Sequence, residues 1–145
     1  MKRLALFGIA VLALSFAAPL PSAQAGDEIW AHNGSKMVAQ FSDEDDTLVI
    51  RYLVPRPGIA AEGVTLGDVV FEGRIEEHDA VFGTAYVFKK GCPPAPYDVE
   101  GQFTSHYRME VHGFAPVRAK NSCTVAGYDV NHNSVLIFTG GPGRK

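Results

Sequence analysis

The chain has 145 residues, and 16 Asp and Glu against 13 Lys and Arg give it a formal net charge of −3 with neutral histidines. This length suits one domain with one hydrophobic core. The slightly acidic balance excludes a general electrostatic attraction to nucleic acid, so we predict no nucleic-acid partner.

The first 25 residues have the pattern of a secretory signal peptide. A basic start, Lys2-Arg3, precedes an apolar run from Leu4 to Leu20, and Ala23 to Ala25 supplies the small residues that signal peptidase requires. The alternative is a retained membrane anchor. It is disfavoured because the run is short for a bilayer and contains proline.

Cleavage before Gly26 would leave 120 residues with a net charge of −5, because it removes two basic residues and no acidic one. No later apolar stretch is long enough to cross a membrane. We therefore predict a signal peptide over residues 1–25, one periplasmic or secreted domain over 26–140, and a flexible tail over 141–145.

A β-hairpin is expected where the mature chain begins. Asn33-Gly34 is the preferred centre of a type I′ turn, since both positions need a positive φ, and the flanking runs Ile29–His32 and Ser35–Phe41 would pair. His32, beside the turn, would be displayed at a sheet edge, and Trp30 would share its face because strand faces alternate.

Trp30 and Gly34 are predicted to be structural. The indole would close one end of the core beneath the hairpin, with its N–H bound by the turn backbone. The competing hypothesis makes Trp30 an exposed binding anchor, because tryptophan is enriched at the energetic centres of interfaces.

An arginine between two prolines is the strongest binding signal. Arg56 lies in the stretch Pro-Arg-Pro-Gly, and prolines on both sides stiffen its backbone. A pinned guanidinium suits carboxylate or phosphate recognition, although an intramolecular ion pair is the more ordinary role. We predict His32, Asn33 and Arg56 as ligand-facing residues.

Most of the remaining chain has the pattern of strands. Residues 57–68 could hold one helical turn at most, and no other segment after Gly26 shows helical periodicity. About eight strands would build an all-β domain, a small antiparallel barrel or sandwich. Besides the hairpin, the predicted strands are Thr47 to Val54, Asp68 to Ile75, Ala80 to Lys90, Tyr107 to Phe114 and Ser134 to Gly140.

Cys92 and Cys123 are the only cysteines. In an exported chain such a pair predicts one disulfide. A metal site is disfavoured because neither cysteine has a second cysteine or a histidine at zinc-ligand spacing.

Metal and catalytic motifs are incomplete. Asp129, Asn131 and Asn133 match the first ligands of a calcium loop, but Ser134 and Gly140 occupy the positions that need glycine and glutamate. The chain has no Gly-x-Ser-x-Gly motif. We therefore predict no metal, no cofactor and no catalytic residue.

Several segments together resemble a family of small exported β-domain proteins and modules from alphaproteobacteria. They are "WAHNGSKM", "RPG", "GVTLGDVVFEG" and "GTAYVFKKGC", followed by Cys123. Similar modules occur attached to caspase-like peptidase domains. The resemblance implies a self-contained accessory or binding domain in which Trp30, the hairpin turn and "GTAYVFKKGC" are framework. It assigns no catalytic residue.

We therefore expect a non-catalytic periplasmic or secreted domain that binds a protein, peptide or cell-envelope ligand. The alternative is a small envelope-directed hydrolase using a histidine or a carboxylate pair. A histidine and a carboxylate converging in a deep pocket would favour the enzyme, and a shallow, dry and largely neutral surface would favour the binder.

Overall fold

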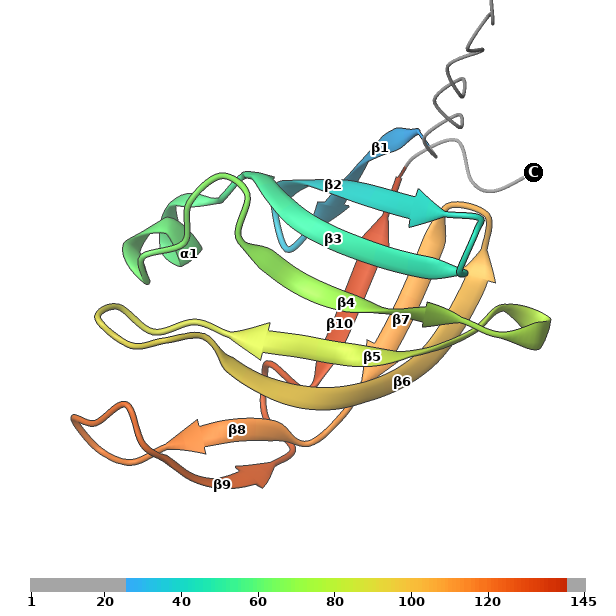
Figure 1. Cartoon of the computed structure of the whole chain (residues 1–145). Helices are drawn as coiled ribbons and strands as arrows, with labels where there is room; N and C mark the ends of the chain where they lie inside the picture. Colours follow the sequence, from blue (N-terminus) through green and yellow to red (C-terminus); the bar gives the residue numbers. More distant parts are fainter. Residues whose placement is uncertain (1–25, 141–145) are drawn as a thin grey trace, which may run out of the picture.

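The computed structural model describes residues 26–140, so the predicted signal peptide and tail lie outside the described residues. The fold is an eight-stranded antiparallel barrel with a separate two-stranded hairpin (Figure 1). The all-β prediction is confirmed, and of the two predicted architectures, barrel and sandwich, the structure is a barrel.

The elements are β1 (Asp27–His32), β2 (Ser35–Ser42), β3 (Thr47–Val54), α1 (Pro57–Ala61), β4 (Val69–Ile75), the 3₁₀ turn η1 (Glu77–Asp79), β5 (Ala80–Val87), β6 (Ala95–Ser105), β7 (Arg108–His112), β8 (Ala115–Arg118), β9 (Val125–Asp129) and β10 (Val135–Thr139).

The barrel is a meander closed by its first and last strands. Strands β1 to β7 pair with their neighbours in sequence, β10 pairs with β7, and the register Ala31 to Thr139 joins β10 to β1. The β8–β9 hairpin is inserted between β7 and β10. Within residues 26–140 no helix has the length and apolar character needed to cross a membrane.

The core follows from the alternation of side chains along the strands. On β2, Met37, Ala39 and Phe41 are buried, whereas Lys36 and Gln40 on the alternate face are exposed. The same period of two runs through β3 and fills the interior with apolar side chains. Eight strands enclose a space that side chains can fill or that can hold one small ligand.

The hairpin prediction is confirmed. Asn33 and Gly34 have φ values of 48° and 80°, and His32 pairs with Ser35 across the turn. The two residues therefore adopt the positive φ angles that a type I′ turn requires.

The Gly34→Val variant should lose about 1–2 kcal/mol of unfolding free energy, because a β-branched residue is strained at positive φ. Urea denaturation followed by circular dichroism measures the loss. Gly127→Val is the matched control, since a Cβ at Gly127 meets no atom within 4 Å and its φ is not positive. Equal stability losses in the two variants would contradict the role assigned to the turn.

Strand β6 is missing from the sequence-based prediction. It is eleven residues long and begins at Ala95, inside a Pro-rich stretch that predicts a turn. Pro96 is tolerated because this part of β6 pairs with β5 alone, and β7 joins β6 only from Glu100 onward. The short strands β8 and β9 also escape prediction.

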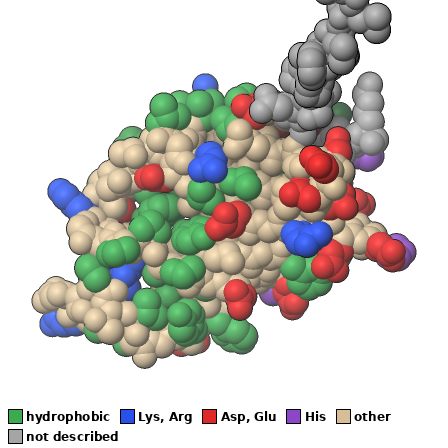
Figure 2. All heavy atoms as spheres, viewed as in Figure 1, with side chains coloured by type: hydrophobic (Ala, Val, Ile, Leu, Met, Phe, Trp, Pro, Cys, Tyr) green, Lys and Arg blue, Asp and Glu red, His purple; other side chains and the backbone are tan. Residues whose placement is uncertain are grey.

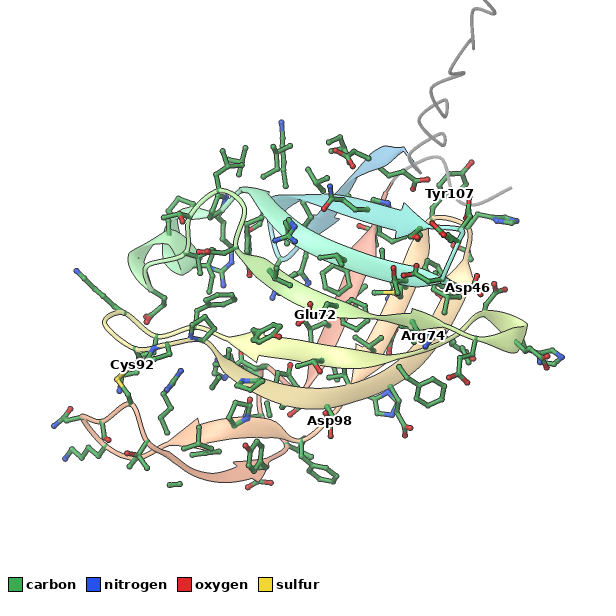
Figure 3. All side chains as sticks on the ribbon, viewed as in Figure 1. Asp46, Glu72, Arg74, Cys92, Asp98 and Tyr107 are labelled. Carbon is green, nitrogen blue, oxygen red and sulfur yellow. A yellow bond between two sulfur atoms is a disulfide. The ribbon has the colours of Figure 1, made fainter. Side chains whose placement is uncertain are left out.

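The predicted disulfide between Cys92 and Cys123 is confirmed. Cys92 lies in the β5–β6 connection and points toward the loop that joins β8 to β9 (Figure 3). The disulfide therefore holds the inserted hairpin against the barrel.

Trp30 is buried, with 2% of its surface exposed, but its surroundings differ from the prediction. Its ring packs against Phe41 and Phe103, near the β2–β3 and β6–β7 turns. These turns lie at the opposite end of the barrel from the β1–β2 turn, beneath which the indole was predicted to lie. The indole N–H donates to the Glu28 carboxylate at 3.0 Å rather than to the turn backbone. The sequence correctly predicts that Trp30 faces the core. The prediction that its ring lies toward the β1–β2 turn is wrong, because the ring lies toward the other end of the barrel.

Candidate functional site

The connections between strands differ in length at the two ends of the barrel. At one end, the closed end, three short turns join β2 to β3, β4 to β5 and β6 to β7. At the other, the open end, lie the β1–β2 turn and three longer connections: 55–68 with α1, 88–94 with Cys92, and 113–134 with the β8–β9 hairpin. Four separate segments of the chain therefore lie at the open end of the barrel (Figure 1).

A cavity of about 530 Å³ occupies the open end, and we call it the mouth cavity. Tyr52, Tyr97 and Leu136 contribute to its lining from the barrel strands, and Arg56 and Lys89 contribute from the connections. A larger hollow of about 900 Å³ lies on the outer face over β3 to β7, where Phe82 and Phe114 are exposed. The mouth cavity is the better candidate because polar groups converge in it from distant segments.

His32 lines the mouth cavity instead of standing at a sheet edge as predicted. Its half-buried ring lies 4.8 Å from the ring of Phe138, and Nδ1 is 2.9 Å from the carbonyl oxygen of Ile137. A carbonyl oxygen only accepts, so Nδ1 carries the proton and the neutral ring keeps a lone pair on Nε2. Burial lowers the pKa of His32, and the positive charge of Arg56 lowers this pKa further, against the raising effect of the Ile137 hydrogen bond.

This lowered pKa predicts a pH dependence of stability. Unfolding returns the imidazole to a pKa of about 6.5, so the unfolded chain takes up a proton that the folded one resists. The contribution of His32 to stability is present above that pH and is lost as pH falls through the folded pKa. His32→Asn, which retains an N–H donor, should lose less stability than wild type between pH 7.5 and 5, measured by thermal unfolding.

The His112→Asn variant is the control, because His112 is exposed on β7. It should keep the pH dependence of wild type. Identical pH profiles for wild type and His32→Asn would show that His32 is not the group responsible.

Two tyrosines line the cavity, Tyr52 from β3 and Tyr97 from β6. The Tyr97 hydroxyl donates a short hydrogen bond to the carbonyl oxygen of Asn133. Tyr52 is only 4% exposed, its ring stacks edge-on at 5.8 Å from Phe88, and its hydroxyl makes no hydrogen bond within residues 26–140. Burial raises the pKa of both side chains to about 12, so each hydroxyl remains a proton donor at neutral pH.

Arg56 is held by its backbone. Its N–H donates to the Ser35 hydroxyl at 2.9 Å, and its carbonyl oxygen accepts from the N–H groups of Ile59 and Ala60 at the start of α1. The side chain extends past Gly58, where an added Cβ would lie 2.4 Å from Nη1. Arg56 is exposed at the rim of the cavity, and the described part of the chain offers its guanidinium no hydrogen bond or ion pair.

Two further cations fix the wall of the mouth cavity. Lys89 Nζ donates to the carbonyl oxygen of Ser122 at 3.2 Å. Arg118 donates to the carbonyl oxygens of Cys123 and Pro93, at 2.6 Å each, and its Nε is buried without a partner within residues 26–140. With the disulfide, these contacts join the β8–β9 hairpin to the β5–β6 connection.

Charge is separated along the barrel axis. The turns at 43–46 and 76–79 carry seven carboxylates at the closed end. The mouth cavity is lined by Arg56, Lys89 and Arg118 and by a single carboxylate, Glu62. Figure 2 shows many of the acidic side chains gathered toward the closed end, with a basic side chain among them, and further basic side chains at the opposite end of the same face. An anion would therefore be directed to the open end although the chain is acidic overall.

All three residues predicted to face a ligand, His32, Asn33 and Arg56, line the mouth cavity. Sequence reasoning missed Tyr52 and Tyr97. The alternation of β3 places Tyr52 on the inward face of Leu48 and Ile50, so that signal was present. Tyr97 could not be placed because β6 itself was not predicted.

The comparisons with known proteins add no assignment. Within residues 26–140 no three side chains of His, Cys, Asp or Glu lie close enough together to hold a metal ion. Comparisons of this chain with family models, curated proteins and solved structures found no match.

Proposed function

We propose that this protein is a non-catalytic binding domain of the periplasm or the extracellular medium, and that it takes a protein, peptide or cell-envelope ligand at the open end of the barrel. The supporting observation is a preformed cavity in which donors from several segments converge and two of them, Arg56 and Tyr52, have no partner within residues 26–140. Unpaired donors in a concave site suit ligand recognition, because a ligand can satisfy them without breaking a contact within the protein. The signal-peptide pattern and the disulfide support the compartment.

A hydrolase using His32 remains the alternative, and its support is the neutral imidazole in the cavity. Ser35 pairs with His32 across the hairpin, but its hydroxyl accepts from the Arg56 N–H and no hydrogen bond joins it to the imidazole. No carboxylate contributes to the pKa of His32. Ser35 as nucleophile, His32 as base and a carboxylate to orient the imidazole are therefore not aligned as in a catalytic triad. This favours binding over catalysis.

The test is a titration of isotope-labelled protein, residues 26–145, with peptide and glycan fragments released from a bacterial cell envelope. We expect backbone amide shifts around Tyr52, Arg56 and Asn133, with Tyr107 at the closed end unaffected and the fragment masses unchanged. Fragments shortened after incubation would favour the hydrolase. Absence of open-end shifts with every fraction would contradict the proposal.

A further inference from the structure

We propose that the mouth cavity binds a carboxylate group through the Arg56 guanidinium and the Tyr52 hydroxyl, on a ligand that carries an N–H or O–H donor beside that carboxylate. This inference rests on the proposed function and names the chemistry that the same site recognises. A hydroxy acid or the last residue of a peptide would have this chemistry.

The first argument is the unpaired hydroxyl of Tyr52, which lines the mouth cavity. Tyr97 donates to the carbonyl oxygen of Asn133, whereas the hydroxyl of Tyr52 makes no hydrogen bond within residues 26–140. The Tyr52 hydroxyl is not among the fully buried polar atoms of the described residues, so it is accessible from the cavity although the residue as a whole is 4% exposed. A ligand oxygen in the cavity can therefore accept a hydrogen bond from it.

Arg56 differs from every other arginine in the described part of the chain. Arg51 donates to Gln40 and to the carbonyl oxygen of Gly67. The guanidinium groups of Arg74, Arg108 and Arg118 likewise have protein partners. Arg56 alone among these five has its guanidinium unpaired, and it faces the mouth cavity. It is the free planar fork that a carboxylate fits with two parallel hydrogen bonds.

Arg56, Tyr52 and His32 all line the mouth cavity. The Arg56 side chain also passes close to the β1–β2 turn beside His32, since a Cβ at Gly34 would lie 3.7 Å from Arg56 Cδ. One unpaired guanidinium matches the single negative charge of a carboxylate, and Lys89 and Arg118 add attraction from the wall. The doubly charged phosphate group would leave one charge without a free cation, which favours the carboxylate.

His32 sets the second requirement on the ligand. Its Nδ1 is used by Ile137, so Nε2 is the remaining polar atom of the ring and accepts a hydrogen bond while the ring is neutral. A ligand that places a donor beside its carboxylate would satisfy Arg56, Tyr52 and His32 together. The volume of about 530 Å³ admits a small acid or the end of a chain.

The experiment measures Kd by protein-observed NMR for four probes. Acetyl-alanyl-alanine and lactate each carry a carboxylate with a neighbouring donor. Acetyl-alanyl-alanine amide lacks the carboxylate, and inorganic phosphate is the competing anion.

We expect shifts of the open-end amide signals with at least one carboxylate probe. Arg56→Gln should weaken its binding by about tenfold or more, because a charge-assisted bidentate contact is lost. Tyr52→Phe should weaken it by roughly threefold to tenfold, as expected for one hydrogen bond.

Two matched variants control for general damage. Arg51→Gln changes an arginine on the outward face of β3, where it donates to Gln40. Tyr107→Phe changes a tyrosine that is 57% exposed at the closed end. Both should bind as wild type, and thermal unfolding should show that every variant folds. Binding of lactate alone would identify a small acid as the ligand source, and binding of the peptide alone would identify a chain end.

Three outcomes would overturn the inference: no shift with either carboxylate probe, tighter binding of phosphate than of both, or equal affinity in Arg56→Gln. The two proposals fail separately. If envelope fragments shift the open end while Arg56→Gln binds them unchanged, the carboxylate inference fails and the binding function stands. If neither the envelope fragments nor the four probes shift the open-end amide signals, both the carboxylate inference and the binding function fail.

Discussion

Replacing Trp30 with alanine should lower the free energy of unfolding by about 3–5 kcal/mol, the usual cost of removing a large aromatic ring from a core. The indole is 2% exposed and packs at 6.2 Å from the Phe41 ring and 6.1 Å from the Phe103 ring. Its loss would leave a void near the closed end and would also leave Glu28 without its indole partner. Urea denaturation followed by circular dichroism measures the change without using tryptophan emission.

Phe114→Ala is the control, since that ring is 66% exposed, and it should change stability by less than about 0.5 kcal/mol. In the wild-type protein a core indole should emit blue-shifted light and resist acrylamide quenching. Wild-type stability in Trp30→Ala together with red-shifted, readily quenched emission would instead support the view of Trp30 as an exposed binding anchor.

The strands with regular patterns could be predicted from the sequence because local chemistry determines them. A run of β-branched and apolar residues predicted β3 over its observed bounds, Thr47–Val54, and Asn-Gly predicted the first hairpin. Closure of the barrel could not be predicted. It depends on the pairing of Ala31 with Thr139, and nothing in either strand marks the other as its partner. The sequence therefore does not distinguish a barrel from a sandwich.

The inward position of His32 shows a second limit. Strand alternation correctly placed it on the face of Trp30, yet a residue next to a tight turn was expected to be displayed at the edge. It is half-buried because long connections around the open end extend beyond the short β1–β2 turn and build a wall there. Burial at a strand end depends on what other segments cover, which a local pattern does not contain.

The candidate site was predictable only in its local part. Local signals in the sequence indicated three of its residues: the Asn-Gly turn indicated His32 and Asn33, and the flanking prolines indicated Arg56. Tyr52 and Arg118 act through their positions relative to distant segments. Arg118 in particular joins the cavity wall by donating to the carbonyl oxygens of Val87, at the end of β5, and of Pro93, in the β5–β6 connection. No spacing in the sequence reveals this role.

Opening the Cys92–Cys123 disulfide should cost about 3.5–4 kcal/mol of unfolding free energy. The cysteines are 31 residues apart, and the chain-entropy argument gives this value for the freedom that the bond removes from the unfolded chain. Cys92→Ser, Cys123→Ser and the double variant should lose nearly the same amount, because either change alone opens the loop and the two losses are not additive. Urea denaturation of the three variants measures it.

The disulfide should also control the mouth cavity. Without it, the β8–β9 hairpin would be held to the β5–β6 connection by hydrogen bonds such as those from Lys89 to Ser122 and from Arg118 to Pro93, which place charges in the cavity wall. The double variant should therefore bind the carboxylate probe more weakly than wild type even below its unfolding transition, where circular dichroism still reports a folded barrel. A double variant with wild-type stability, or two alkylatable thiols in unreduced, denatured wild-type protein, would contradict the stabilising role. Unchanged affinity in a folded double variant would show that the barrel strands alone shape the cavity.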